Sequence, residues 1–191
     1  MRASSRCALS WRSVRRVSVV GNSGSGKSTL ARLLAERLGV PWVELDSIHH
    51  QPNWEPLPRD EFRARVERIT ARGGWVVDGN YSSVRDLVWA RADTVVWLDL
   101  PRRTVMRQVV WRSIRRAALR VELWNGNRER WGAVFSRNPD ESIVAWAWHK
   151  HTAYRHRYAV AAGNPANAHL RFVRVRTRTE ARRLLARAAG G

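Results

Sequence analysis

Cysteine, lysine and long apolar stretches are scarce in this sequence. Cys7 is the single cysteine among 191 residues, which excludes an internal disulfide framework and a cysteine-rich zinc site. No segment reaches the roughly 18 consecutive apolar residues that a membrane-spanning helix needs. We therefore expect a soluble protein of the reducing cytoplasm, with no membrane partner. The hydrophobic fraction of 44% is nevertheless large enough for a sizeable core.

Acidic residues are also few, and the chain carries a formal net charge of +19. Lys27 and Lys150 are the only lysines, so arginine supplies nearly all of the positive charge. A field of this sign attracts polyanions, including nucleic acids. The arginines are spread along the whole sequence, however, and no short basic block or DNA-reading motif concentrates them. We favour a compositional origin of the charge over a nucleic-acid-binding surface, which stays the alternative.

The first 13 residues are rich in Arg and Ser and contain no acid. This composition is typical both of an organellar transit peptide and of an extension ahead of the folded part. We favour a disordered extension over residues 1–13. We expect residues 14–191 to form one domain, as a monomer or a homodimer.

Short apolar runs alternate with longer helical patterns along the chain. This alternation predicts an α/β fold in which helices cover a parallel sheet. We expect strands at Val17–Val20, Trp42–Leu45, Trp75–Val77, Thr94–Leu98 and Leu170–Val175. We expect helices at Lys27–Leu38, Asp60–Ala71, Thr104–Val121, Asp140–Ala161 and Glu180–Ala189. A polar, Gly- and Asn-containing segment, approximately residues 123–140, is typical of a mobile lid.

A complete P-loop pattern, G-x-x-x-x-G-K-S, follows the first expected strand and opens the first expected helix. Its glycines allow successive backbone N–H groups to point at phosphate oxygens, and the helix N-terminus adds a partial positive charge. The pattern therefore predicts binding of ATP or GTP. We expect Lys27 to reach the β- and γ-phosphates and the Ser28 hydroxyl to ligate Mg²⁺. The predicted nucleotide-binding residues are Gly21, Asn22, Ser23, Gly24, Ser25, Gly26, Lys27, Ser28 and Thr29.

Aspartates end three of the expected strands. Asp78 and Asp99 are both candidates for the carboxylate that orients Mg²⁺, and we favour Asp78 because Gly79 lets the chain stay close to phosphate. Asp99 suits a turn cap better. Asp46 ends the second strand, at the sheet edge where α/β proteins bind ligands. It could accept the proton of an attacking hydroxyl, although a loop-capping role remains open.

Arginine forks neutralise the charge that spreads over a transferred phosphoryl group. Arg112 follows the fourth expected strand, and Arg128 lies in the lid-like segment. We select these two as the candidates that close on the transition state. The adjacent His49 and His50 would project to different faces, so a metal pair is disfavoured and contact with a substrate is the better interpretation.

Together these motifs resemble the adenylate kinase-like branch of P-loop kinases, and within it the small bacterial topology modulation proteins. The resemblance covers roughly Val17 to Ala188. It depends on the P-loop, on Leu-Asp-Ser-Ile-His-His-Gln-Pro-Asn-Trp, on Gly-Trp-Val-Val-Asp-Gly-Asn-Tyr and on Val-Val-Trp-Leu-Asp-Leu-Pro followed by arginines. It implies a five-stranded sheet of order 2-3-1-4-5 with a lid between strands four and five.

The same resemblance implies that Asp78 orients Mg²⁺ waters, that Asp46 holds an acceptor hydroxyl and that Arg112 is the arginine at the lid base. Adenylate kinases continue Asp-Gly with Phe-Pro-Arg, whereas this chain reads Asn80-Tyr81-Ser-Ser-Val-Arg85. Two interpretations follow: Arg85 serves the same end as that clamp arginine from a new position, or the acceptor is not AMP. We expect transfer of the γ-phosphoryl group of Mg-ATP to a nucleotide, a nucleoside or a hydroxylated metabolite. The alternative is an ATP-dependent regulator that acts on nucleic acid.

Overall fold

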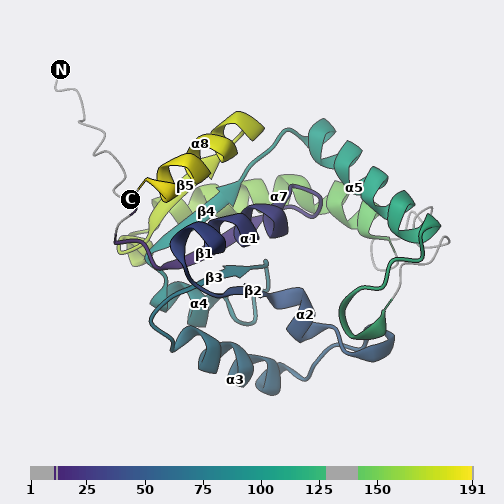
Figure 1. Ribbon diagram of the computed structural model, residues 1–191, viewed down its shortest axis with the longest axis horizontal. Coiled ribbons are helices and arrows are strands. Elements are labelled where there is room, and N and C mark those ends of the chain that lie inside the picture. Colours follow the sequence, from purple (N-terminus) through teal and green to yellow (C-terminus); the bar gives the residue numbers. More distant parts are fainter. Residues whose placement is uncertain (1–10, 12, 128–141, 191) are drawn as a thin grey trace.

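Five parallel strands form a single sheet at the centre of the computed structural model, which describes residues 11, 13–127 and 142–190 (Figure 1). The sheet has the order β2-β3-β1-β4-β5, which confirms the expected order. Cys7, Arg128 and most of the expected lid lie outside the described residues. The strands are β1 (Arg16–Gly21), β2 (Trp42–Glu44), β3 (Trp75–Asp78), β4 (Thr94–Leu98) and β5 (Arg171–Val175).

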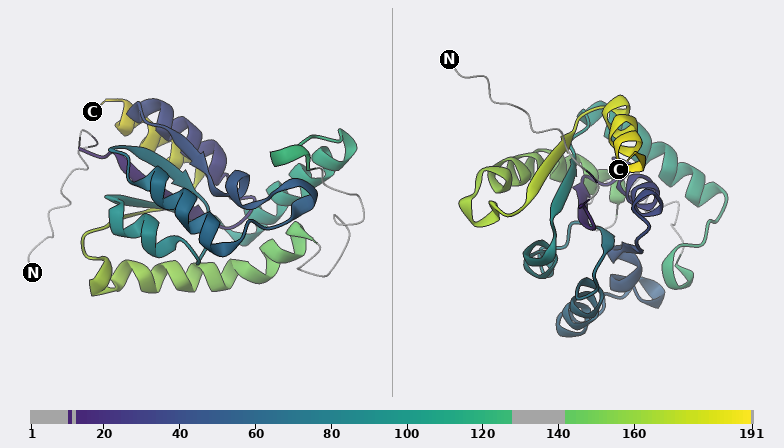
Figure 2. Two further views of the ribbon diagram at one scale, coloured as in Figure 1. Left: turned by 90° about the horizontal axis from the view of Figure 1, so that it is seen from below. Right: turned by 60° about the vertical axis from the view of Figure 1, so that its left-hand side comes forward.

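Helices cover both faces of this sheet and make three layers (Figure 2). One face packs against α1 (Lys27–Leu38) and α8 (Arg178–Ala189). The other face packs against α3 (Arg59–Thr70), α4 (Arg85–Arg91) and α7 (Ile143–Gly163). The layers, the parallel sheet and its order together establish the three-layer α/β P-loop fold.

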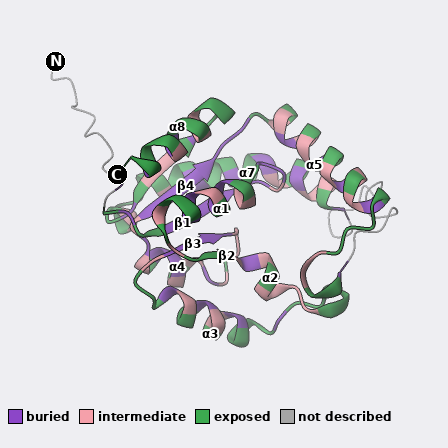
Figure 3. Ribbon diagram, viewed as in Figure 1, coloured by how far each residue is buried: buried purple, intermediate pink, exposed green. Residues whose placement is uncertain are grey.

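The central strands are buried on both faces, as Figure 3 shows. In β1, Val17 and Val19 face the α1 and α8 side, whereas Val20 faces the α3, α4 and α7 side. The neighbouring Ser18 is the polar exception, and its hydroxyl accepts a hydrogen bond from Trp89 Nε1 at 3.3 Å. A strand buried on both faces needs an unbroken apolar run. This is why the strand positions were readable from the sequence.

Helix ends agree with the expectations to within a few residues. The helix α1 ends at Leu38, and Gly39 takes a φ of +63°, the left-handed cap that glycine adopts at little cost. The helix α5 (Arg102–Ala118) begins after Pro101 and extends away from the sheet (Figure 1). The helix α7 is capped by the Ser142 hydroxyl, which accepts from the amide of Ala145.

Two helices were not expected. The segment Leu45–His49 forms α2 directly after β2, so that β2 ends at Glu44 rather than at Leu45. The segment Arg85–Arg91 forms α4 between β3 and β4. The described residues also contain three single turns: η1 (Pro52–Trp54), η2 (Trp124–Gly126) and η3 (Pro165–Asn167).

Near the N-terminus, Trp11 is only 4% exposed and packs with Val14 in the core beneath α1 and α8. Residues 1–10 and 12 lie outside the described part of the chain. Within that part, every helix is too short or too polar to cross a bilayer.

Candidate functional site

The loop between β1 and α1 turns tightly because three of its glycines have positive φ angles. Gly21, Gly24 and Gly26 take φ values of +150°, +76° and +90°. Gly24 also lies against α5, where an added Cβ would stand 2.7 Å from the Cβ of Val109. A side chain at that position would therefore be strained by its backbone and blocked by α5. The loop is a preformed cradle of backbone N–H groups ahead of the N-terminus of α1.

Lys27 and Ser28 begin α1 and lie at the carboxyl edge of the sheet. The Lys27 ammonium donates to the carbonyl of Asn22 at 3.2 Å, within the loop. Burial lowers the pKa of Lys27, while the nearby carboxylates of Asp78 and Asp46 oppose this shift. The Ser28 hydroxyl donates to Glu44 Oε1 at 2.9 Å. A lysine beside the cradle can stabilise phosphate charge, and a serine hydroxyl there can ligate a cation.

Asp78 ends β3 with its side chain inside the protein. The residue is 2% exposed, and Oδ2 has no hydrogen-bond partner among the described residues. Burial raises the pKa of Asp78 to about 6, and the Lys27 charge acts in the opposite direction. A buried carboxylate oxygen without a hydrogen-bond partner is costly unless a cation compensates it. The orphaned oxygen beside Ser28 therefore fits a Mg²⁺ ion.

A cation at this place would depend on the nucleotide. No group of three or more His, Cys, Asp or Glu residues in the described ranges could hold a metal ion. Mg²⁺ commonly keeps several waters and takes only one or two protein ligands together with substrate phosphates. The pair Ser28 and Asp78 matches that mode of binding.

Asp99, the alternative carboxylate, has a different environment. Both of its oxygens are paired: Oδ2 accepts from Arg174, and Oδ1 lies 3.1 Å from Nε of Arg155. It therefore joins the end of β4 to β5 and α7. The observed contacts favour Asp78 over Asp99 as the cation-orienting carboxylate.

Asp46 lies in the first turn of α2 rather than at the end of a strand. Its Oδ1 accepts a hydrogen bond from the Tyr81 hydroxyl at 2.7 Å, and that hydroxyl is also 3.3 Å from His50 Nε2. The Asp46 charge favours the ammonium form of Lys27 and so opposes the lowering of its pKa by burial. The carboxylate thus lies on the same edge as the P-loop lysine. His49 and His50 contact aromatic rings around it.

Arg112 projects from α5 to the P-loop, where its Nη2 donates to the Ser23 hydroxyl at 3.0 Å. Its charge also lowers the pKa of Lys27. Of the two arginines selected from the sequence, the structure therefore brings Arg112 to the predicted phosphate site. Arg128 lies outside the described residues, and its role stays a prediction.

Two residues of this edge were missed by the sequence reasoning. Glu44 bridges the P-loop and the start of the expected lid, because Oε1 accepts from Ser28 and Oε2 accepts from Trp124 Nε1 at 2.7 Å. Asn80 pairs with the peptide groups of Gly21: its Oδ1 accepts from the amide at 3.1 Å, and its Nδ2 donates to the carbonyl at 2.5 Å. Glu44 stands two residues before Asp46, a spacing that could have drawn attention to it.

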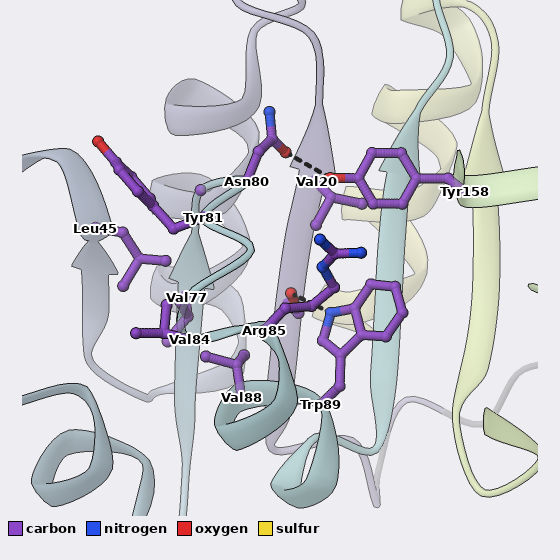
Figure 4. A pocket seen from close by; sticks show the side chains of 12 residues that line it. Val20, Leu45, Val77, Asn80, Tyr81, Val84, Arg85, Val88, Trp89 and Tyr158 are labelled. Carbon is purple, nitrogen blue, oxygen red and sulfur yellow. Dashed lines mark hydrogen bonds between the residues drawn. The ribbon is translucent and has the colours of Figure 1, made fainter. Parts of the chain in front are cut away.

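A pocket lies beneath Asn80, between the sheet and the helices α4 and α7 (Figure 4). The Tyr158 hydroxyl donates to Asn80 Oδ1 at 2.9 Å across its upper rim. The guanidinium of Arg85 stands inside, with its central carbon 5.7 Å from the centre of the Trp89 ring. No carboxylate pairs with Arg85 among the residues that the structure describes. The pocket therefore contains a cationic group that no described carboxylate neutralises.

The turns η1 and η2 meet over α2. Asn127 Nδ2 donates to the carbonyl of Gln51 at 2.8 Å, and Asn127 Oδ1 accepts from the amide of Trp54 at 2.9 Å. Trp54 and Asn125 have positive φ angles of 62° and 56°. Such strained backbone in residues other than glycine is common at functional sites. This junction holds the start of the expected lid against the loop that follows Asp46.

Replacement of Asp78 by asparagine is expected to remove a pH dependence of stability. Because the pKa of Asp78 is raised to about 6, protonation of this carboxyl group contributes its full stabilisation of the fold at low pH. The contribution is lost as pH rises from about 4 through about 6. The difference in the free energy of unfolding between Asp78→Asn and wild type should therefore shift in favour of the variant by up to ~3 kcal/mol from pH 4 to pH 7.5. Urea unfolding of the unliganded proteins across this range measures the difference.

Asp86→Asn is the matched control for this experiment. Arg63 lowers the pKa of Asp86, so this carboxylate contributes stability at neutral pH that is lost on acidification. Its replacement should change the pH curve in the opposite direction and by less, because the pair is exposed. Parallel curves for Asp78→Asn and wild type would contradict the assigned environment of Asp78.

Comparison with known proteins relates the chain to shikimate kinases. No family model matches it. The "Shikimate kinase" of Gloeobacter violaceus is 34% identical over 109 residues, which cover 48% of this chain and 59% of that protein. The "Shikimate kinase" of Persephonella marina is 31% identical over 111 residues, which cover 50% of this chain and 67% of that protein. The match to the first of these relatives thus spans less than two thirds of its length.

Among solved structures, a shikimate kinase from Acinetobacter baumannii in complex with shikimate has a TM-score of 0.54. The match covers 92% of this chain and 91% of that one, at 19% identity. At this identity the similarity supports a shared fold and does not assign a role to any residue of this chain.

Proposed function

This chain belongs to the P-loop kinase family that contains the shikimate kinases, and we propose that it transfers the γ-phosphoryl group of Mg-ATP to a small hydroxylated metabolite. One observation carries the proposal. A carboxylate, Asp46, lies at the same sheet edge as the P-loop, two residues after Glu44, which accepts a hydrogen bond from Ser28 of the P-loop. A nucleotide-binding protein that catalyses neither transfer nor hydrolysis would need the cradle and the lysine, but would have no use for a proton acceptor beside them.

On the donor side, the P-loop amides that have no acceptor among the described residues, such as those of Gly24 and Gly26, would bind the phosphate oxygens, and Lys27 would neutralise charge on the transferred group. Ser28 and Asp78 would hold Mg²⁺, which when bound stabilises the charge that develops on the phosphates. Arg112, already hydrogen-bonded to Ser23, would reach the γ-phosphoryl oxygens from the α5 side. These side chains provide electrostatic stabilisation and positioning, which dominate catalysis of phosphoryl transfer.

On the acceptor side, the acceptor oxygen attacks the γ-phosphorus while the bond to the bridging oxygen of ADP breaks. Asp46 accepts the proton that the acceptor hydroxyl loses. Arg85 would bind an anionic group of the acceptor in the pocket of Figure 4. The name of the relatives, shikimate kinase, supports a hydroxy acid as the acceptor class. The absence of the Phe-Pro-Arg continuation argues against a nucleotide.

A panel of acceptors tests this proposal. ADP release from Mg-ATP is measured alone and with hydroxy acids, sugars, nucleosides and nucleoside monophosphates, with Lys27→Ala as the blank. We expect stimulation by a hydroxy acid and little response to the uncharged sugar of the same skeleton, since Arg85 would have no anion to bind. Stimulation by nucleoside monophosphates alone would overturn the acceptor class. Slow hydrolysis that no acceptor stimulates would overturn the kinase assignment.

In that last case nucleic acid is the next ligand to add. The net charge of +19 predicts binding that weakens steeply with salt if phosphate contacts drive it. Stimulation of ATP hydrolysis by DNA or RNA at physiological salt would support the nucleic-acid regulator.

A further inference from the structure

The carboxylate of Asp46 is held from one side by a tyrosine that the proposed chemistry does not use. We propose that Tyr81 is a positioning residue for phosphoryl transfer: its hydroxyl fixes Asp46 Oδ1 and thereby leaves Oδ2 for the proton of the acceptor. This inference rests on the proposed function. The contact that carries it is the 2.7 Å hydrogen bond from the Tyr81 hydroxyl to Asp46 Oδ1.

The ring of Tyr81 is held in place by its neighbours. Its centre lies 4.5 Å from that of His49 and 5.2 Å from that of Phe62, which packs edge to face against it. Figure 4 shows the hydroxyl end of the ring directed away from Trp89 and Tyr158. Because these contacts involve the ring alone, removal of the hydroxyl should leave the ring where it is. The hydroxyl itself has two contacts, the 2.7 Å hydrogen bond to Asp46 Oδ1 and a longer contact of 3.3 Å with His50 Nε2.

Tyr81 remains a hydrogen-bond donor under all working conditions. Burial and the charge of Asp46 raise the pKa of Tyr81 far above its ordinary value. The hydroxyl therefore keeps its proton and can donate it to a carboxylate that stays an acceptor. A neutral donor orients a base and leaves the negative charge of the base intact. A lysine or arginine at this position would instead neutralise that charge.

His50 supports the hydroxyl from the other side. Its Nε2 lies 3.3 Å from the Tyr81 oxygen, and because that hydroxyl donates to Asp46, the imidazole is the donor in this contact. The opposite nitrogen, Nδ1, is buried without a partner among the described residues, which agrees with a neutral ring protonated at Nε2. Burial lowers the pKa of His50, which favours the neutral form. The His50 ring stacks on Trp124, with centres 6.0 Å apart.

The series His50, Tyr81, Asp46 therefore connects the η1–η2 junction to the reacting carboxylate. Small displacements of a catalytic group are expensive, and a 1 Å error can cost roughly 100-fold in rate. Loss of the Tyr81 hydroxyl frees one oxygen of Asp46 and lets the carboxylate rotate. The expected result is a lower turnover number with no change in nucleotide binding.

The test compares Tyr81→Phe with Thr70→Val, which removes a buried hydroxyl from the end of α3. We expect Tyr81→Phe to lower kcat by about 10- to 100-fold, with the KM for ATP within twofold of wild type. Thr70→Val should change neither constant. In the Asp46→Asn background, Tyr81→Phe should have no further effect on kcat, since the two groups act as a unit. A loss of the same size in both backgrounds would overturn the proposal.

A second readout separates this inference from the proposed function. The ¹³C resonance of the Asp46 carboxyl group, observed in the nucleotide-free protein, should move in Tyr81→Phe and stay in place in Thr70→Val. If wild type shows no acceptor-dependent turnover while the resonance moves, the kinase assignment fails and the contact stands. If the resonance does not move, Tyr81 does not hold Asp46 and the positioning role is overturned.

Discussion

Lys27→Ala should lower acceptor-dependent ADP release by ~10²-fold or more while the protein stays folded. Lys27 contacts the P-loop through its ammonium group, which donates to the carbonyl of Asn22. No other described lysine could replace it. Its charge is needed most when negative charge spreads over the transferred group, so the loss should fall on kcat. Steady-state kinetics with the acceptor identified by the panel measures the effect.

Lys150→Ala is the matched control, because Lys150 is the only other lysine in the sequence. It lies on α7 with its ammonium 4.8 Å from the centre of the Trp146 ring, a contact of the cation–π kind. Its removal should leave turnover near the wild-type value. Turnover of Lys27→Ala within tenfold of wild type would contradict the phosphate-binding role of Lys27.

Asp46→Asn is expected to lower turnover by ~10²- to 10⁴-fold, the range that a lost general base produces. Asparagine has the same shape and still offers an oxygen to the Tyr81 hydroxyl, which donates to Oδ1 at 2.7 Å in the wild type. The variant therefore changes proton acceptance while it preserves geometry. Single-turnover kinetics separates the chemical step from ATP binding, which should be unchanged.

Asp86→Asn serves as the control for this prediction, since Asp86 forms an exposed ion pair with Arg63 and contacts neither Asp46 nor Tyr81 in the described residues. It should keep wild-type kinetics. If Asp46→Asn also retained turnover within tenfold, the acceptor proton would have another destination. The carboxylate would then be a binding group rather than a base.

The main elements of the fold could be predicted because each one follows from a local physical requirement. The P-loop needs glycine at positions such as Gly24, whose φ is +76°, and a buried parallel strand needs an uninterrupted apolar run such as Thr94–Leu98. The sheet order, in contrast, came from the family resemblance. No feature of a single strand specifies its neighbours.

The short helices were missed for an identifiable reason. The helix α2 has five residues and begins at Leu45, immediately after a strand of three. Both elements are too short for a periodic hydrophobic pattern to develop. Their apolar residues follow one another and are interpreted as a single strand. Asp46 was consequently assigned to a strand end, although its place at the sheet edge was anticipated.

Contacts across long sequence separations could not be derived from the chain alone. Glu44 meets Trp124, which lies 80 residues further along, and Tyr81 meets Asp46 across 35 residues. A glutamate within Trp-Val-Glu-Leu looks like an ordinary edge residue until both partners are in place. Such pairs depend on the exact crossing of loops at the sheet edge, which composition and periodicity do not encode.

The backbone of Gly21 restricts which side chain can stand at position 80, where the chain has asparagine. The backbone of Gly21 offers an N–H donor and a carbonyl acceptor, and the Asn80 amide forms a hydrogen bond with each. Its Oδ1 also accepts a hydrogen bond from the Tyr158 hydroxyl. Aspartate of the same size would lack the donor, and glutamine would place the amide one methylene too far. Leucine would match the volume and satisfy neither group. In any wider collection of related chains, asparagine at this place should therefore mark those whose P-loop is built in this way.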